Sequence, residues 1–279
     1  MAYEGYKCLK VRLDRGVAFV TIDSPPINLL TIEMVQELVR LAAEVEADGR
    51  VKVIVFDSAN PDYFIAHFDV SVLLQFPDVP APRPTEIHAL DKVHEAFRTM
   101  PKVSIGQVAG RARGGGSEFL LGLDMRFGAL GKMIFNQVEV GLGILPGGGG
   151  TQRLPRLIGQ ARALEVILGS MDISAEVAER YGYLNRALPP AELRPFVEGL
   201  AYRIASFPAE SIALAKKAVL AAAELPLIEG LIEESFLFNQ SCALPAAKRL
   251  MKAFMDKGGQ THEVELDWDR LLSELAQEG

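Results

Sequence analysis

The sequence predicts a layered α/β fold with an appended helical part, and three observations support this prediction. In the first half of the 279 residues, short apolar runs alternate with segments whose apolar residues recur at helical spacing. Such alternation is typical of a layered α/β core. Two glycine-rich stretches, residues 112–124 and 141–154, follow predicted strands. Beyond Gly159, long amphipathic segments indicate helices. With 49% hydrophobic residues the chain can bury a large core.

The first elements follow from local pattern. Residues 6–13 and 16–22 are short runs rich in β-forming residues and predict two strands joined by a tight turn. Thr31 is suited to cap the helix that follows, because its hydroxyl can accept from a free backbone N–H. The apolar face of this helix would comprise Met34, Val35, Leu38, Leu41 and Val45. Residues 51–58, "VKVIVFDS", form an apolar run that predicts a buried strand.

A proline-rich segment separates this part from the next elements. Residues 76–85 contain four prolines in ten positions, so we expect an irregular surface segment. A helix over residues 85–99 and a buried strand over 102–110 should follow. Further short strands are expected within 125–135 and 181–188.

Composition excludes several classes of function. The net charge of −7 and the absence of a basic block argue against a nucleic-acid partner. Cys8 and Cys242 are far apart, so no disulfide framework or zinc site is expected. The first ten residues predict no signal peptide, and no apolar run is long enough to span a membrane. We therefore expect a soluble cytoplasmic protein without a metal.

The stretch "ARGGGSEFLLGLD", residues 112–124, resembles three motifs and fits none. A phosphate-binding P-loop requires lysine where Gly116 stands. A dinucleotide fingerprint and a hydrolase nucleophile elbow both require glycine where Phe119 stands. We therefore expect Ser117 to be a helix-start hydroxyl and not a nucleophile.

What remains is a strand, a glycine run and a helix. Backbone N–H groups at a helix start lack intrahelical partners, and glycine lets a substrate oxygen approach them closely. An oxyanion hole can be built in this way. Glu118 would lie beside it, either as a catalytic group or merely as a carboxylate that complements the helix dipole.

A second carboxylate lies in an apolar, glycine-rich neighbourhood. Glu139 has no obvious basic partner there, so its pKa should be raised. Two carboxylates in different environments can serve as an acid and a base. The alternative is that Glu139 is a solvated loop residue.

Together, "GQVAGRARGGGSEFLLGLDMRFGA" and "FNQVEVGLGILPGGGGTQRLPRLIG", supported by "AEVAERYGYLNRALP", resemble the crotonase superfamily, also called the enoyl-CoA hydratase/isomerase family. The resemblance extends from "PPINLL" to "AFMDK". It implies a spiral of ββα units over residues 1–200, which carries the active site. Residues 201–279 would form a helical oligomerisation region, in a homotrimer or a dimer of trimers.

The resemblance also implies roles for individual residues. Backbone N–H groups of Gly115 and Phe68 would hold the thioester oxygen of an acyl-CoA as it becomes an enolate. Glu118 would orient and deprotonate water, and Glu139 would protonate the α-carbon. The implied substrate-binding positions are Ala66, His67, Asp69 and Gly114 around the oxyanion hole, and Ile27, Leu29, Phe254 and Lys257 toward coenzyme A.

Three positions depart from the family pattern: His67 and Asn136 replace glycines, and Val138 replaces a proline. If the loop needs a positive φ, His67 is strained there, although histidine tolerates it better than most residues. His67 could serve as an acid/base group or simply narrow the pocket. His88 and His94, six residues apart in the predicted helix, should not form a paired ligand set.

The sequence therefore predicts a lyase that hydrates 2,3-enoyl-CoA thioesters in fatty acid metabolism, with coenzyme A as part of the substrate and no resident cofactor. One alternative within the fold is an enoyl-CoA isomerase or a hydrolase of C–C bonds in β-dicarbonyl compounds. Another is an acyl-CoA-binding oligomer with little or no catalysis.

Overall fold

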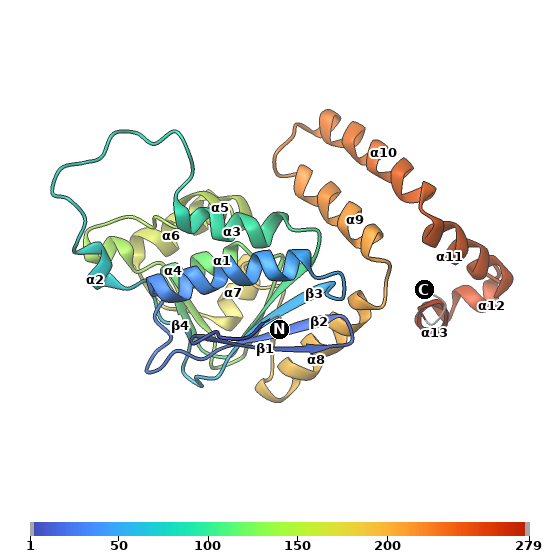
Figure 1. The fold of residues 1–279 in the computed structure, drawn as a ribbon, viewed down its shortest axis with the longest axis horizontal. Coiled ribbons are helices and arrows are strands. Elements are labelled where there is room, and N and C mark those ends of the chain that lie inside the picture. Colours follow the sequence, from blue (N-terminus) through green and yellow to red (C-terminus); the bar gives the residue numbers. More distant parts are fainter. Residues whose placement is uncertain (1–2, 277–279) are drawn as a thin grey trace.

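A computed structural model describes residues 3–276 and contains two sheets (Figure 1). The larger has the order β1 (Leu9–Asp14), β2 (Val17–Ile22), β3 (Val53–Ser58), β5 (Val103–Val108), β7 (Met125–Ala129) and β10 (Arg186–Leu188). Only β1 and β2 pair antiparallel in this sheet. The smaller has the order β4 (Tyr63–Ile65), β6 (Arg111–Arg113), β8 (Ile134–Asn136) and β9 (Ile173–Ser174).

The two sheets are built from a repeated unit. The strands β3, β5 and β7 lie in the larger sheet, and each is followed in the chain by a strand of the smaller sheet, β4, β6 and β8. Helices follow each pair: α2 (Val70–Leu73) and α3 (Ala89–Thr99), then α4 (Gly115–Leu121), then α5 (Gly150–Ile158) and α6 (Gln160–Gly169). Because successive units add neighbouring parallel strands to both sheets, the chain winds as a spiral of ββα units, which confirms the predicted fold.

The main core lies inside this spiral. Helix α1 (Ile32–Ala47) buries Met34, Leu38 and Leu41, and the hydroxyl of Thr31 accepts from the N–H of Met34, as expected. Residues on β3 alternate between two cores: Ile54 packs inside, whereas Val53 and Val55 face the other side.

The outer face of the larger sheet is covered by α8 (Pro190–Ala205). Its buried residues Leu193, Val197 and Ala201 pack on β2, β3, β5 and β7. Ile212, beyond the end of α8, also packs against this cluster. The short α7 (Ala175–Tyr181) lies between β9 and β10.

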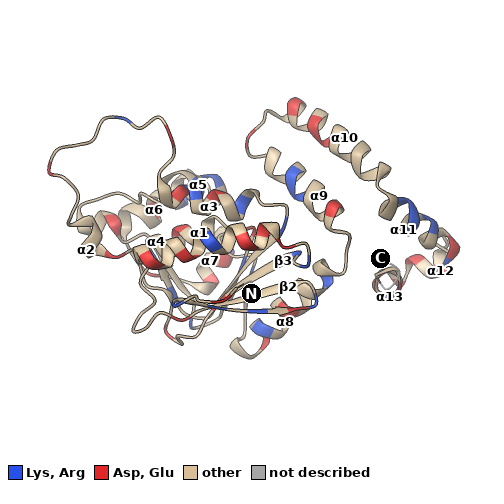
Figure 2. Cartoon of the chain, in the orientation of Figure 1, with Lys and Arg blue, Asp and Glu red and all other residues tan. Residues whose placement is uncertain are grey.

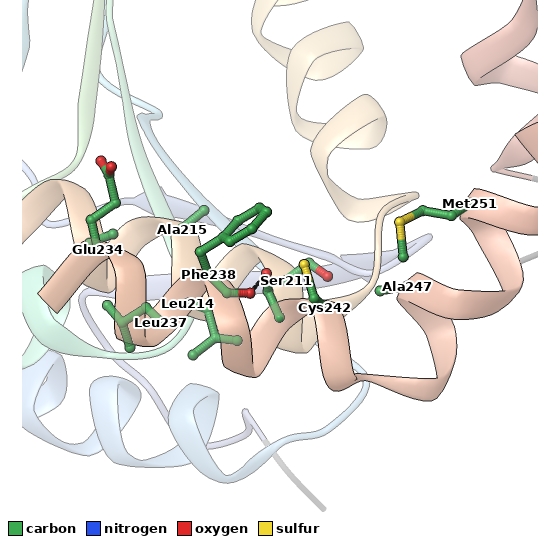
Figure 3. Close-up of a pocket in the computed structure, with 11 residues that line it drawn as sticks. Ser211, Leu214, Ala215, Glu234, Leu237, Phe238, Cys242, Ala247 and Met251 are labelled. Carbon is green, nitrogen blue, oxygen red and sulfur yellow. Dashed lines mark hydrogen bonds between the residues drawn. The ribbon is translucent and has the colours of Figure 1, made fainter. Parts of the chain in front are cut away.

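The remaining helices are α9 (Ala209–Ala221), α10 (Leu227–Ala243), α11 (Pro245–Asp256), α12 (His262–Glu265) and α13 (Trp268–Leu275). Of these, α9 still contacts the α/β body, since Lys216 pairs with Asp124 (2.8 Å), and the later ones lie farther out (Figure 1). A cavity of 380 Å³ lies among α9, α10 and α11, lined by apolar side chains such as Leu214, Phe238 and Met251 (Figure 3). No helix within residues 3–276 has the length and apolarity needed to cross a membrane.

The proline-rich segment is irregular and exposed, as predicted. The helix expected from residue 85 begins instead at Ala89. Residues 85–88 are exposed and contribute nothing to the core, and the helix starts where His88 caps it by accepting from the N–H of Leu90. His88 thus precedes the helix, whereas His94 lies within it.

Candidate active site

Three consecutive glycines follow β6, the second of them begins α4, and each meets different surroundings. Gly114 has φ +48° and donates its N–H to the carbonyl of Asn136, 2.9 Å away. A β-carbon on Gly114 would lie 2.6 Å from Oε1 of Glu139, and one on Gly116 would overlap the carbonyl oxygen of Ile65. The run therefore lets α4 approach both the smaller sheet and the second carboxylate.

The middle glycine faces the loop after β4. A β-carbon on Gly115 would lie 3.2 Å from Cβ of Phe68 and 3.4 Å from its amide nitrogen. Gly115 is the first residue of α4, where backbone N–H groups have no intrahelical partner. The structure therefore places the backbones of Phe68 and Gly115 next to each other.

The Phe68 backbone is oriented by Leu30. The N–H of Leu30 donates to the carbonyl of His67 (2.9 Å), and the N–H of Asp69 donates to the carbonyl of Leu30 (3.2 Å). Because Leu30 pairs with the residues on both sides of Phe68, the N–H of Phe68 points away from Leu30. That N–H is thus left available to the space beside Gly115.

His67 is half buried and is not among the residues with positive φ, so the strain considered from sequence is absent. Its Nδ1 lies 2.8 Å from the carbonyl oxygen of Phe68. A carbonyl only accepts, so Nδ1 carries the proton and Nε2 is an acceptor in the neutral ring. The charge of a protonated His67 would lower the pKa of Glu139.

Glu118 lies in the middle of α4 and is buried. Its Oε1 accepts from the N–H of Gly148 (2.8 Å) and from the N–H of Gly150 (2.9 Å), the first residue of α5. The pKa of Glu118 is raised to about 7: burial and, to a smaller extent, the charge of Glu139 raise it, while the two N–H donors oppose the rise. A carboxyl with this pKa can exchange a proton near neutral pH.

Several groups fix α4 and with it Glu118. Arg126 donates to the carbonyls of Leu120 and Leu123 at the end of α4 (3.1 and 2.7 Å).

The prediction that Ser117 is a helix-start hydroxyl is wrong, because α4 begins two residues earlier after a glycine cap. The Ser117 hydroxyl is instead buried and lies 3.0 Å from the hydroxyl of Tyr183.

Glu139 begins the short 3₁₀ helix η1 (Glu139–Leu142) and is buried, which excludes a solvated loop position. Burial raises the pKa of its carboxyl, as the sequence predicted. Among residues 3–276 its Oε2 has no hydrogen-bond partner. The two carboxylates are near enough for the charge of Glu139 to act on Glu118.

Comparison with known proteins shows the family of the chain. A sequence model described as "Enoyl-CoA hydratase/isomerase" matches residues 12–264. The chain belongs to the enoyl-CoA hydratase/isomerase family. A short-chain-enoyl-CoA hydratase from Clostridium acetobutylicum is 33% identical over 86% of this chain and 92% of its own length. A crotonyl-CoA hydratase from Syntrophomonas wolfei is 32% identical over 92% of this chain and 97% of its own.

Solved structures of the enoyl-CoA hydratase/isomerase family share the fold. A crystal structure from Streptomyces avermitilis is 38% identical, covers 98% of this chain and 100% of that one, and has a TM-score of 0.73. The enoyl-CoA hydratase of Bacillus anthracis is 26% identical, covers 90% of this chain and 97% of that one, and has a TM-score of 0.82.

Two features of this family member's site were not predicted from the sequence. The sequence did not predict that N–H groups of the second glycine-rich stretch hold Glu118, although a glycine run that enters a helix start was an available signal. Gln137 was also missed. It is fully buried, both its side-chain amide atoms lack partners among the described residues, and a β-carbon on Gly150 would lie 2.8 Å from its Nε2.

The residues expected to contact coenzyme A are divided between two places. Ile27 and Leu29 flank Asn28, whose side chain donates to the carbonyl of Phe64, next to the loop that carries Phe68. Ala66 is buried in that loop, and Asp69 caps α2 by accepting from the N–H of Ser71.

Phe254 and Lys257 lie in and after α11, which Figure 1 shows far from α4 in the same chain. Phe254 packs edge-on against Trp268, and Lys257 lies 3.6 Å from Glu274. Lys257 also lines a shallow surface hollow with Arg249 and Lys252, in the basic region of α11 visible in Figure 2. These two positions therefore do not join the carboxylates within one chain.

Proposed function

We propose that this protein is a lyase that adds water reversibly across the 2,3-double bond of an enoyl-CoA thioester. The observation that carries the proposal is the approach of the Phe68 amide to Gly115, with Glu118 three residues further along the same helix. Family membership and relatives named as hydratases support it. Coenzyme A enters as part of the substrate, and no resident cofactor takes part.

In the proposed reaction, the N–H groups of Phe68 and Gly115 donate to the thioester oxygen and stabilise the enolate charge that develops there. Glu118 accepts a proton from water while the hydroxyl oxygen bonds to C3. Glu139 donates a proton to C2, so that water is added across the double bond. The raised pKa of each carboxyl supports this exchange, since one must be ionised and the other protonated in the same pH range.

Crotonyl-CoA and longer enoyl-CoA thioesters test the proposal directly. Hydration removes the conjugated double bond, so ultraviolet absorbance should fall on adding the protein. Glu118→Gln and Glu139→Gln should each reduce the rate by about 10²–10⁴-fold. Glu46→Gln, an exposed position, should leave the rate unchanged. Full activity in either site variant would overturn the assigned roles. Thermal stabilisation by CoA esters without turnover would instead favour a binding protein.

We also propose that the part after α8 mediates assembly into a homotrimer or a dimer of trimers. Large exposed apolar side chains on α10 support this, because an isolated chain seldom leaves so many in water. They are Leu227, Ile228, Leu231, Ile232, Phe236 and Phe238. Sedimentation equilibrium should give a mass three or six times that of the 30.4 kDa chain, and a monomer would contradict the proposal.

A further inference from the structure

His94 lies on α3, outside the groups assigned to the reaction, and is fully buried. Its Nδ1 lies 3.0 Å from the carbonyl oxygen of Gly148. Since a carbonyl only accepts, Nδ1 carries the proton and donates. Within residues 3–276, Nε2 has no partner. Burial lowers the pKa of His94 to about 4, so the ring is neutral at working pH and this tautomer persists.

Gly148 links His94 to Glu118. Its carbonyl accepts from His94, and its own N–H donates to Oε1 of Glu118 at 2.8 Å. A β-carbon on Gly148 would lie 2.6 Å from Oε2 of Glu118 and 2.9 Å from Cδ2 of Leu90. Gly148 is therefore held closely between α3 on one side and the carboxylate on the other.

His94 also contacts the helix that carries the carboxylate. Its ring meets Phe119 edge-on, with centroids 6.1 Å apart, and a β-carbon on Gly122 would lie 2.9 Å from Cβ of His94. One side chain thus contacts both α4 and the glycine loop that donates to Glu118. Removal of the His94 side chain would make the position of this loop relative to α4 less fixed.

We propose that His94 is a positioning residue: by donating to the Gly148 carbonyl, it keeps the Gly148 N–H directed at Oε1 of Glu118. This inference rests on the proposed function of Glu118 as the base. The other ionisable groups near the pair are Asp91 and Glu95 on α3, Arg153 on α5, Glu139 on η1 and Tyr183. All of these remain in the variants below.

Two substitutions of similar polarity separate the donor from the packing. In His94→Asn the amide nitrogen takes the place of Nδ1 and can still donate to Gly148. In His94→Gln the amide lies one carbon further, near the place of Nε2, and cannot. Phe97→Leu is the matched packing control, because Phe97 is also fully buried on α3 and also meets Phe119 edge-on.

The readout is the pH dependence of kcat and KM with crotonyl-CoA. A weaker N–H donation to Glu118 raises the pKa of Glu118. In His94→Gln, the fall of kcat toward acidic pH should therefore begin at a higher pH. At neutral pH kcat should fall about 10- to 100-fold, with KM nearly unchanged. In His94→Asn and Phe97→Leu, the pH dependence of kcat should be the same as in the wild-type protein. Equal profiles for the Asn and Gln variants, shifted or not, would overturn the proposal.

A second measurement keeps the inference separate from the proposed function. The pKa of Glu118 can be followed by the infrared carboxyl band, assigned as the band that Glu118→Gln removes. The pKa of Glu118 should rise in His94→Gln and not in His94→Asn, whether or not the wild-type protein hydrates crotonyl-CoA. An inactive wild type with this pattern would contradict the proposed function alone, whereas an unchanged band would contradict the role of His94.

Discussion

A β-carbon placed on Gly115 would lie 3.4 Å from the amide nitrogen of Phe68, although the two residues are 47 positions apart. The space between the two backbones therefore exists because Gly115 has no side chain. A substrate oxygen that receives both N–H groups must occupy the region beside this gap. The relationship explains why glycine stands at this position, since a small side chain would enter that space.

Gly115→Ala should abolish most activity while preserving the fold. The new methyl group would lie 3.1 Å from Leu30 and 3.2 Å from the β-carbon of Phe68, which small side-chain and loop shifts can accommodate. These shifts would separate the two donors, and kcat for crotonyl-CoA should fall about 10²–10³-fold. Circular dichroism should match wild type. A variant with normal kcat would show that the gap is not needed for catalysis.

Gly116→Ala, one residue further, should instead act on stability. Its methyl group would overlap the carbonyl oxygen of Ile65, a backbone atom held in β4. We expect α4 to be pushed from the smaller sheet, with a large fall in melting temperature or insoluble expression. Gly49→Ala is the control, since nothing lies within 4 Å of its β-carbon. Equal stability of the two variants would contradict this packing.

Much of the fold could be predicted from the sequence because its signals are local. The β3 run is buried on both faces and appears in the sequence as an uninterrupted apolar segment. Thr31 could be predicted to cap α1 because its hydroxyl directly precedes an amphipathic helical pattern. The start of α3 was misplaced because residues 85–88 are exposed and have no core to pack against, which the sequence pattern does not reveal.

The site was only partly predictable for a related reason. Glu118 and Glu139 stand out as carboxylates next to glycine runs. The donors to Glu118 come from residues 30 and 32 positions away, and backbone N–H groups leave no residue-specific signal. Likewise His94 resembles any helix histidine until the contact with Gly148, 54 positions away, is seen.

Glu118→Gln should stabilise the protein at high pH. The folded pKa of about 7 exceeds the ordinary 4.5, so the folded state binds the proton more tightly than the unfolded state. In wild type, stability therefore falls as pH rises from about 4.5 through 7. At pH 8 the variant should gain up to about 3 kcal/mol over wild type, and near pH 4 almost nothing. Urea unfolding at both values measures this difference.

An equal gain for Glu118→Gln at both pH values would show that burial does not raise this pKa. Glu46→Gln, an exposed substitution that likewise removes one carboxylate, controls for net charge.

Hydration should show a bell-shaped pH profile. Protonation of Glu118 should reduce the rate as the pH falls through about 7, and loss of the Glu139 proton, whose pKa burial raises, should reduce it as the pH rises. Because the carboxylates interact, the two midpoints describe the pair. Initial rates of crotonyl-CoA hydration between pH 5 and 10, measured at saturating and low substrate, test this. A rate independent of pH over that range would contradict an acid and base pair.

His67→Ala separates hydration from the alternatives within the fold. The bond from Nδ1 to the carbonyl of Phe68 supports the loop, but Leu30 still holds that loop through the carbonyl of His67 and the N–H of Asp69. We therefore expect kcat/KM for crotonyl-CoA to fall less than about tenfold, the size of one neutral hydrogen bond. Isomerisation or β-diketone cleavage that used His67 as the acid/base group would instead be lost in His67→Ala. If wild type cleaved a β-diketone but did not hydrate crotonyl-CoA, and His67→Ala abolished the cleavage, the imidazole would belong at the reacting atoms.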